Sequence, residues 1–329
     1  MKRLSFVIPV YRNERAVTMT YQQIRSVCAT SLARYQCEIV FVDDGSDDGS
    51  LEELLAIRAG DPNVRVVSFT RNFGQMAAIL AGFKEATGDL VVQLSADLQD
   101  PISLVPQMVA EYEKGSEVVV CHREHREDRL TRRLTSRVVY SILRLSFPQI
   151  PAGGFDYILL DRKVVDAFNA VNVRNRFFQG DILWFGYKTT FIPYTRAKRP
   201  IGRSQYTFAK RLKNSIDAIL DSSYLPIRFI SLVGILTALS GFLYALDIAY
   251  ARLRNHIPYP GWAPIMILVL VMGGLLMVML GVIGEYVWRI YDEVKGKPNY
   301  VVRQNYGPGV EATVSREQPA VSHQRSAIR

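Results

Sequence analysis

The sequence predicts an α/β fold with a doubly wound sheet, followed by a hairpin of two membrane-spanning helices. In the N-terminal part, short apolar runs of strand length alternate with segments of helix length, which is typical of a mostly parallel sheet. Two later stretches, 227–250 and 264–288, are predominantly apolar, and each exceeds the roughly 20 residues that a helix needs to cross a bilayer. The 329 residues therefore provide a large polar domain and a smaller membrane anchor.

The expected strands of the polar domain are short apolar runs, several of which end in polar turns. They lie at 4–10, 38–42, 64–69, 90–94, 117–121 and 158–160. The helices between them are expected to lead to Leu32, to span 51–59, to run through Glu85 and to begin at Pro101. An aromatic-rich stretch at 174–188 is expected to fill the core or to cover a pocket.

The stretch 90–101, LVVQLSADLQDP, places acidic and amide side chains directly after a buried strand. A carboxylate at the carboxyl end of such a strand lies where open α/β sheets bind their ligands. One or two carboxylates together with substrate phosphates are also what Mg²⁺ requires. We therefore expect Asp97 to hold a divalent ion against the diphosphate of a nucleotide-sugar. The alternative is an acidic turn in which Asp97 and Asp100 only cap the helix that begins at Pro101.

A second acidic turn, Asp43-Asp44-Gly45-Ser46, follows the strand at 38–42. Its carboxylates could accept hydrogen bonds from a uracil N–H or from a ribose hydroxyl, which predicts a loop that reads a nucleotide. The alternative is a plain Asp-rich turn without a ligand. Both alternatives are compatible with this short motif.

The net charge of +9 is concentrated in two regions, 123–144 and 196–228. Basic residues just before a membrane helix typically meet anionic lipid head groups, so we expect membrane lipids as partners rather than nucleic acid. The segment 130–147 carries arginines beside an apolar stripe, which predicts a helix in the head-group plane or, alternatively, a helix packed on the sheet with a solvated basic face. A second basic amphipathic helix is expected at 207–221, and the loop at 199–206, RPIGRSQY, suits phosphate binding because arginine offers a planar fork of donors.

The loop between the two apolar stretches, 251–263, carries fewer basic residues than the segments on either side of the hairpin. The positive-inside rule therefore places both termini in the cytoplasm. The N-terminus has too short an apolar run for a cleaved signal peptide. Glu285, near the end of the second stretch, is expected to pair with Arg289, and the polar tail beyond about 306 is expected to be disordered.

The three cysteines have no CxxC spacing, and their odd number argues against a disulfide framework, which fits a reducing cytosolic compartment. The predicted organisation is a domain at 1–206, a juxtamembrane amphipathic helix at 207–226, spans at 227–250 and 264–288 with an extracytoplasmic loop at 251–263, and a cytoplasmic segment at 289–329.

Several motifs occur together in one order: VIPVY, VDDGS, RNFGQ, SADLQDP, GFDYILLDRKVVD, RPIGRSQY and GEYVWRIYDEVKGKPNY. Together they resemble the polyisoprenyl-phosphate glycosyltransferases of family 2, a group that contains dolichol-phosphate mannose synthase. The branch that the chain resembles most is that of the bacterial undecaprenyl-phosphate glucosyltransferases of O-antigen modification. The resemblance implies a mixed GT-A sheet, the bacterial inner membrane, and the inverting transfer of a sugar from a nucleotide-sugar to a polyprenyl phosphate with Mg²⁺ or Mn²⁺. It also makes a homotetramer plausible.

The resemblance assigns roles to individual residues of this sequence. Nucleotide-binding positions are Pro9, Tyr11, Glu14, Asp43, Asp44, Ser95 and Asp97, and the metal-binding positions are Asp97 and Gln99. Positions associated with phosphate recognition are Arg123, Arg132, Arg133, Arg199 and Ser204, and Asp156 matches an acid at the reaction centre. The chain departs from the family pattern with Ser95 where an acid is common, Ile158 where an arginine is common, and Gln205 where a lysine is common. The serine puts a carboxylate pair on the metal in doubt and leaves more of the task to Asp97.

The expected chemistry needs no strong general base, because a lipid phosphate is already anionic at neutral pH. The metal held by Asp97 would stabilise the departing diphosphate, and arginines would hold the acceptor phosphate in line. Asp156 is expected to orient the acceptor or the sugar. UDP-glucose is the favoured donor, with galactose, N-acetylated sugars and aminoarabinose derivatives as alternatives. Competing functions are a processive polysaccharide synthase and a non-catalytic partner of a lipid-sugar flippase.

Overall fold

The computed structural model describes residues 1–123, 141, 143–145, 147–151, 154–171, 173, 176–195, 225–253 and 263–307. The chain divides into two compact units. The first contains 1–172, 178–207 and 298–329, and the second contains 173–177 and 208–297. The expected amphipathic helices at 130–147 and 207–221 and the tail beyond 307 lie wholly or mostly outside the described residues.

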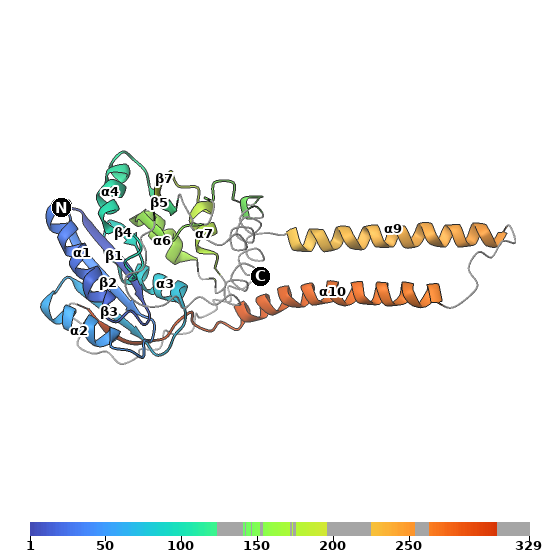
Figure 1. The fold of residues 1–329 in the computed structure, drawn as a ribbon, viewed down its shortest axis with the longest axis horizontal. Helices are drawn as coiled ribbons and strands as arrows, with labels where there is room; N and C mark the ends of the chain where they lie inside the picture. Colours follow the sequence, from blue (N-terminus) through green and yellow to red (C-terminus); the bar gives the residue numbers. More distant parts are fainter. Residues whose placement is uncertain are drawn as a thin grey trace, which may run out of the picture. The chain divides into compact units, whose positions relative to one another are not determined.

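An eight-stranded mixed sheet forms the centre of the described part of the first unit, in the order β7-β5-β6-β4-β1-β2-β3-β8 (Figure 1). The strands are β1 Arg3–Val10, β2 Gln36–Asp43, β3 Val64–Phe69, β4 Leu90–Gln93, β5 Val118–Arg123, β6 Tyr157–Asp161, β7 Thr189–Tyr194 and β8 Val302–Tyr306. β4, β1, β2 and β3 run parallel. β6 is antiparallel to both β4 and β5, β7 is parallel to β5, and β8 is antiparallel to β3. Each strand expected from the sequence is present, and the doubly wound mixed sheet is confirmed.

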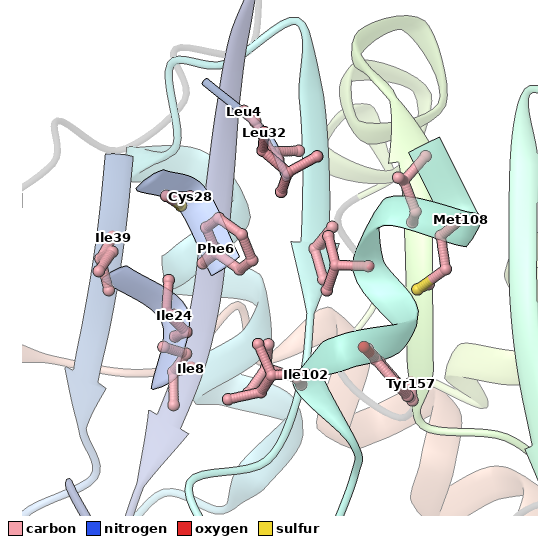
Figure 2. Packing of buried hydrophobic residues seen from close by; sticks show 14 of the residues in the cluster. Leu4, Phe6, Ile8, Ile24, Cys28, Leu32, Ile39, Ile102, Met108 and Tyr157 are labelled. Carbon is pink, nitrogen blue, oxygen red and sulfur yellow. The ribbon is translucent and has the colours of Figure 1, made fainter. Parts of the chain in front are cut away.

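Helices cover both faces of the sheet. They are α1 Ala16–Thr30, α2 Ser50–Gly60, α3 Gln75–Glu85, α4 Val105–Glu113 after a 3₁₀ turn at Ile102–Leu104, α6 Arg162–Ala170 and α7 Phe178–Trp184. Successive side chains of a strand point to opposite faces, so Phe6 of β1 packs with α1, α2 and α4, whereas Val7 packs with α3, α6 and α7. Figure 2 shows the first of these cores, with Phe6 and Ile8 of β1 beside Ile24 of α1.

The two outermost strands, β7 and β8, were not expected from the sequence. Their sequences, TTFIPY and VRQNY, lack a continuous apolar run, and most of their side chains are only partly buried. An edge strand has a neighbour on one side only, so it tolerates the proline of β7 and the polar residues of β8. Edge strands therefore give a weaker sequence signal than the buried strands between them.

The expectation that the chain has no disulfide is wrong for one pair of cysteines. Cys28 near the end of α1 and Cys37 near the start of β2 are bonded, with their Cα atoms 6.5 Å apart. That separation is in the usual range for a disulfide. An odd number of cysteines is compatible with one disulfide, because the third cysteine, Cys121, stays free. Cys121 is buried, and burial raises the pKa of its thiol to about 12.

The second unit contains two long helices, α9 Leu225–Leu253 and α10 Ala263–Val294. Both are long and apolar enough to cross a membrane, over 227–244 and 267–294 respectively. The helices contact each other at Gly234, where a methyl group would lie 3.1 Å from the Cε atom of Met279. The expected pairing of Glu285 with Arg289 is confirmed, with 3.2 Å between Oε1 and Nε.

Candidate active site

The loops that follow β1 and β2 are tied to each other at the carboxyl edge of the sheet. The N–H of Asp44 donates to the carbonyl of Val10 at 2.8 Å. Arg12 forms a bidentate pair with Asp47, at 2.5 Å for each of its two contacts, and the N–H of Asn13 donates to Ser50 Oγ at 2.8 Å. These bonds hold the first loop even though Arg12 has a left-handed backbone, with φ of 53°.

Asp43 and Asp44 are both buried and both bind protein groups. Asp43 accepts hydrogen bonds from the N–H of Ser46 and from Ser68 Oγ, each at 3.1 Å. Asp44 accepts from the N–H groups of Phe73 and Gly74 at 2.6 and 2.9 Å. Both acids therefore shape the loops around the expected nucleotide site, in addition to any contact with a nucleotide.

Gly45 lies where two backbone segments approach closely. Its φ is +65°, and a methyl group at this position would lie 2.4 Å from the carbonyl carbon of Arg71 and 2.7 Å from the Cα atom of Arg71. A side chain cannot be accommodated at that distance from backbone atoms. The loop after β2 and the segment that leads into α3 are thus held in close contact.

The other expected nucleotide-binding residues lie beside these loops. Pro9 is a partly buried residue of β1, Tyr11 is partly buried directly after that strand, and Glu14 is exposed. A methyl group on Gly49 would lie 3.1 Å from the carboxyl group of Glu14, which places Glu14 against the loop after β2. The structure thus brings Tyr11 and Glu14 to the same edge as Asp43 and Asp44.

The expected metal loop follows β4. The N–H of Leu94 donates to the carbonyl of Val7 at 3.2 Å, so the pairing with β1 continues past the end of β4. Asp97 is 7% exposed and accepts a hydrogen bond from the N–H of Gln99 at 3.2 Å. Leu98 between them is left-handed, with φ of 58°, and Ser95 and Gln99 are partly buried. In the described part of the chain, neither the 3₁₀ turn after Pro101 nor α4 has a side-chain cap, which does not support a capping role for Asp97 or Asp100.

The donor set of this loop suits a hard divalent cation with few protein ligands. The carboxylate of Asp97 and the amide oxygen of Gln99 belong to one tight turn, and both are oxygen ligands of the kind that Mg²⁺ and Mn²⁺ prefer. Among the described residues, no group of three or more His, Cys, Asp or Glu side chains is arranged so that it could hold a metal ion without a substrate. The loop therefore fits an ion whose remaining ligands come from substrate phosphate and water.

Arg123 and Asp156 form an ion pair beside the metal loop. Arg123 ends β5, and its Nη2 atom lies 3.0 and 3.3 Å from the two carboxyl oxygens of Asp156, which precedes β6. The side chain of Arg123 is 18% exposed and that of Asp156 is 37% exposed. Burial opposes the charge of Arg123, but Asp156 and Tyr194 raise the pKa of its guanidinium above the ordinary value. A cation and an anion, both partly open to solvent, thus lie together at the expected reaction centre.

Three residues with polar contacts at this site, Asp100, Tyr157 and Tyr194, are not among the site residues that the resemblance assigns. Asp100 is 3% exposed and accepts a hydrogen bond from the hydroxyl of Tyr194 at 2.7 Å. Tyr157 donates to the carbonyl of Pro101 at 3.1 Å, which fixes the same loop. Tyr194 ends β7, a strand that was not expected, so no sequence signal placed it here.

Four of the expected phosphate-binding residues, Arg132, Arg133, Arg199 and Ser204, lie outside the described residues.

These features define a class of protein. A mixed α/β sheet carries acidic loops at the carboxyl ends of its parallel strands β1, β2 and β4, and an Arg–Asp pair lies on the neighbouring strands. Open α/β sheets bind their ligands at this edge, and the arrangement is that of the mixed GT-A sheet that the sequence predicts.

Comparison with known proteins identifies the family. The family model described as glycosyl transferase family 2 matches residues 5–185, and the chain belongs to this family. Glycosyltransferase YkcC of Bacillus subtilis, described as uncharacterised, is 37% identical over 305 residues, which are 92% of this chain and 94% of that protein. The SfII prophage-derived bactoprenol glucosyl transferase of Shigella flexneri is 33% identical over 92% of this chain and 98% of that protein.

A solved structure with a similar chain path is glucosyl-3-phosphoglycerate synthase of Mycobacterium tuberculosis in complex with Mn²⁺, uridine diphosphate and phosphoglyceric acid. The TM-score is 0.49 and the identity is 18%, over 66% of this chain and 76% of that chain.

Proposed function

We propose that this protein transfers glucose from UDP-glucose to a polyprenyl phosphate with inversion at the anomeric carbon. The observation that carries the proposal is the similarity, over nearly the whole length of both chains, to a bactoprenol glucosyl transferase. The acidic loop after β4 and the adjacent Arg–Asp pair support it, because they offer a site for a diphosphate beside a site for an acceptor phosphate. The two long apolar helices suit an enzyme whose acceptor is a membrane lipid.

In the proposed mechanism, Asp97 and Gln99 would hold Mg²⁺ or Mn²⁺. The ion would supply positive charge to the departing diphosphate. Arg123 binds the acceptor phosphate and directs its oxygen at the anomeric carbon, an orientation that accounts for a large part of the rate of such transfers. Asp156, paired with Arg123, orients the guanidinium and the sugar instead of removing a proton, because a phosphate monoester is already anionic.

We further propose that the nucleotide is bound by Pro9, Tyr11, Glu14, Asp43, Asp44 and Ser95, and that Arg132, Arg133, Arg199 and Ser204 add to the binding of phosphate. Both termini and the catalytic unit would lie in the cytoplasm of a bacterium, with α9 and α10 in the inner membrane. The distribution of basic residues around the hairpin supports this orientation.

The test uses the purified full-length protein with undecaprenyl phosphate, radiolabelled UDP-glucose and Mn²⁺. Label should pass into an organic-extractable, acid-labile glycolipid. Asp97→Asn should reduce this transfer at least about a hundredfold, because the variant loses the charge that holds the cation. Asp89→Asn, at the opposite end of the same strand, is the matched control and should transfer normally, because its side chain accepts only the N–H of Arg3 in the described part of the chain.

Three results would contradict the proposal. Label in a polymer would indicate a processive synthase. Absence of transfer from UDP-glucose and from every other nucleotide-sugar tried would indicate a non-catalytic partner. Full activity of Asp97→Asn would exclude the proposed role of that carboxylate.

A further inference from the structure

The hydroxyl group of Tyr194 lies between an acid and a cation. It donates to Asp100 Oδ1 at 2.7 Å, and Tyr194 is the cross-strand partner of Arg123 in the parallel pair of β5 and β7. The phenol and the guanidinium interact electrostatically, and this interaction contributes to the raised pKa of Arg123. The three side chains form a chain of interactions from an acid through a hydroxyl to a cation.

This chain connects two parts of the proposed active site that come from different strands. Asp100 belongs to the same loop as Asp97 and Gln99, after β4. At the other end, Arg123 holds Asp156 in front of β6. The hydroxyl of Tyr194 is therefore a direct link between the loop proposed to hold the metal and the pair proposed to hold the acceptor phosphate.

The ring of Tyr194 is fixed in place by its surroundings. Tyr194 is 5% exposed, and its ring packs edge to face against that of Tyr157 with 6.0 Å between the centroids. Tyr157 in turn donates to the carbonyl of Pro101 in the metal loop. Burial raises the pKa of the Tyr194 phenol far above its ordinary value, so the hydroxyl keeps its proton at any working pH. The hydroxyl is thus a permanent donor to Asp100.

We propose that Tyr194 is a positioning residue for glycosyl transfer. It holds the guanidinium of Arg123 at a fixed position relative to the loop that carries Asp97. The proposal rests on the proposed function, because it assigns the aligned groups to the acceptor phosphate and to the leaving diphosphate. Alignment of the two is what an in-line displacement requires. Tyr194 itself touches neither reactant.

A tyrosine elsewhere in the same unit provides a matched control. Tyr35, directly before β2, is 8% exposed and donates to Glu113 Oε1 at 2.6 Å. Tyr35→Phe and Tyr194→Phe each remove one buried hydroxyl that donates to a carboxylate, and each keeps the ring and its packing. Since Tyr35 lies at the amino end of the parallel strands, only the second change affects the proposed site.

The experiment compares the two variants in thermal unfolding, in affinity for UDP with Mn²⁺, and in kcat and KM for undecaprenyl phosphate. Both should lower Tm by similar amounts and bind UDP as the wild type does. Tyr194→Phe should lower kcat/KM for the acceptor by about tenfold to a hundredfold, the usual effect of losing a hydrogen bond to a charged group, whereas Tyr35→Phe should not change it. In an Arg123→Lys background, Tyr194→Phe should cause little further loss, because the tyrosine acts through the guanidinium.

The proposal is overturned if Tyr194→Phe retains the kcat/KM of Tyr35→Phe, or if it lowers Tm far more than that control. The proposal is also overturned if the losses of kcat/KM caused by Tyr194→Phe and by Arg123→Lys multiply in the variant that carries both substitutions. An inactive wild-type protein would instead contradict the proposed function, and the two failures are therefore distinct.

Discussion

Gln93, the last residue of β4, has an environment that does not suit its side chain. It is fully buried, and neither its amide nitrogen nor its amide oxygen has a hydrogen-bond partner among the described residues. Its neighbours across the strand pairs are Val7 and Ile158, which belong to the apolar core on the α3 side of the sheet. Burying polar atoms without partners costs free energy, and replacing them with an apolar group of similar shape removes that cost.

Gln93→Met is accordingly expected to raise the free energy of unfolding by about 1–3 kcal/mol. Thermal unfolding of the purified protein measures this, with Gln22→Met on the exposed face of α1 as a control that should change little. A variant that is less stable than the wild type would contradict the prediction. So would a variant that is unchanged in stability but inactive, because the amide would then serve a ligand.

At the scale of single residues, the sequence predicts where the candidate side chains lie in the fold better than it predicts which groups they bind. Asp97 lies where the strand-then-acid pattern predicts it, at the carboxyl end of β4. The ion pair of Arg123 with Asp156 was not expected as a pair, because it depends on the antiparallel register of β5 and β6. For Asp100 the sequence suggests only a possible helix-capping role. Its partner in the structure, Tyr194, comes from the unexpected strand β7.

At the scale of elements, the strand after the second long helix is joined to the loops of the proposed nucleotide site. Tyr300 stacks on Phe69 at the end of β3, with 4.9 Å between the ring centroids and 13° between the ring planes. Phe69 packs edge to face on Phe73, whose N–H donates to Asp44. The N–H of Thr70 donates to the carbonyl of Val301 at 3.1 Å. The segment before β8 thus supports the turn into α3.

Tyr300→Ala is expected to lower the free energy of unfolding by about 2–4 kcal/mol, because it removes an aromatic ring from this stack. It should also weaken the binding of UDP, whereas Tyr300→Phe keeps the ring and should behave as the wild type. Thermal unfolding and titration with UDP and Mn²⁺ measure the two effects. Normal UDP affinity in a destabilised Tyr300→Ala variant would show that the stack stabilises the unit without shaping the site.

The elements that the sequence predicts well are those that bury apolar side chains on both faces. The strands β1 to β6 have such side chains. The bounds of these strands agree with the expected apolar runs to within a few residues. The bond between Cys28 and Cys37 was missed for another reason: the cysteines meet only because α1 returns the chain to the start of β2. Contacts of this kind depend on topology and leave no local pattern.

At the scale of the whole molecule, the proposed orientation in the membrane can be tested with the cysteines that are already present. Cys28 and Cys37 are bonded and Cys121 is buried, so the wild-type protein offers little background to a thiol reagent. With a membrane-impermeant maleimide on intact cells, His256→Cys between the helices should be labelled from outside. Ser315→Cys should be labelled only after lysis. The reverse pattern would contradict the proposed cytoplasmic termini.

The overall division into a sheet domain and a helical hairpin follows from the sequence, because long apolar stretches and alternating strands and helices are strong patterns. The return of the chain to the sheet after α10 does not follow from it. The segment 302–306 is polar and short, and its place is decided by the free edge of β3.

The position of β8 in the chain has a consequence for biosynthesis. Because β8 is encoded after both long helices, a ribosome has already made the entire hairpin before the residues that cover β3 emerge. The edge of β3 in the nascent domain therefore stays open until the hairpin has been made, and in the proposed membrane orientation insertion of the hairpin precedes closure of the sheet. A domain produced without α9, α10 and β8 keeps that edge unprotected, where strands of other molecules can add to it.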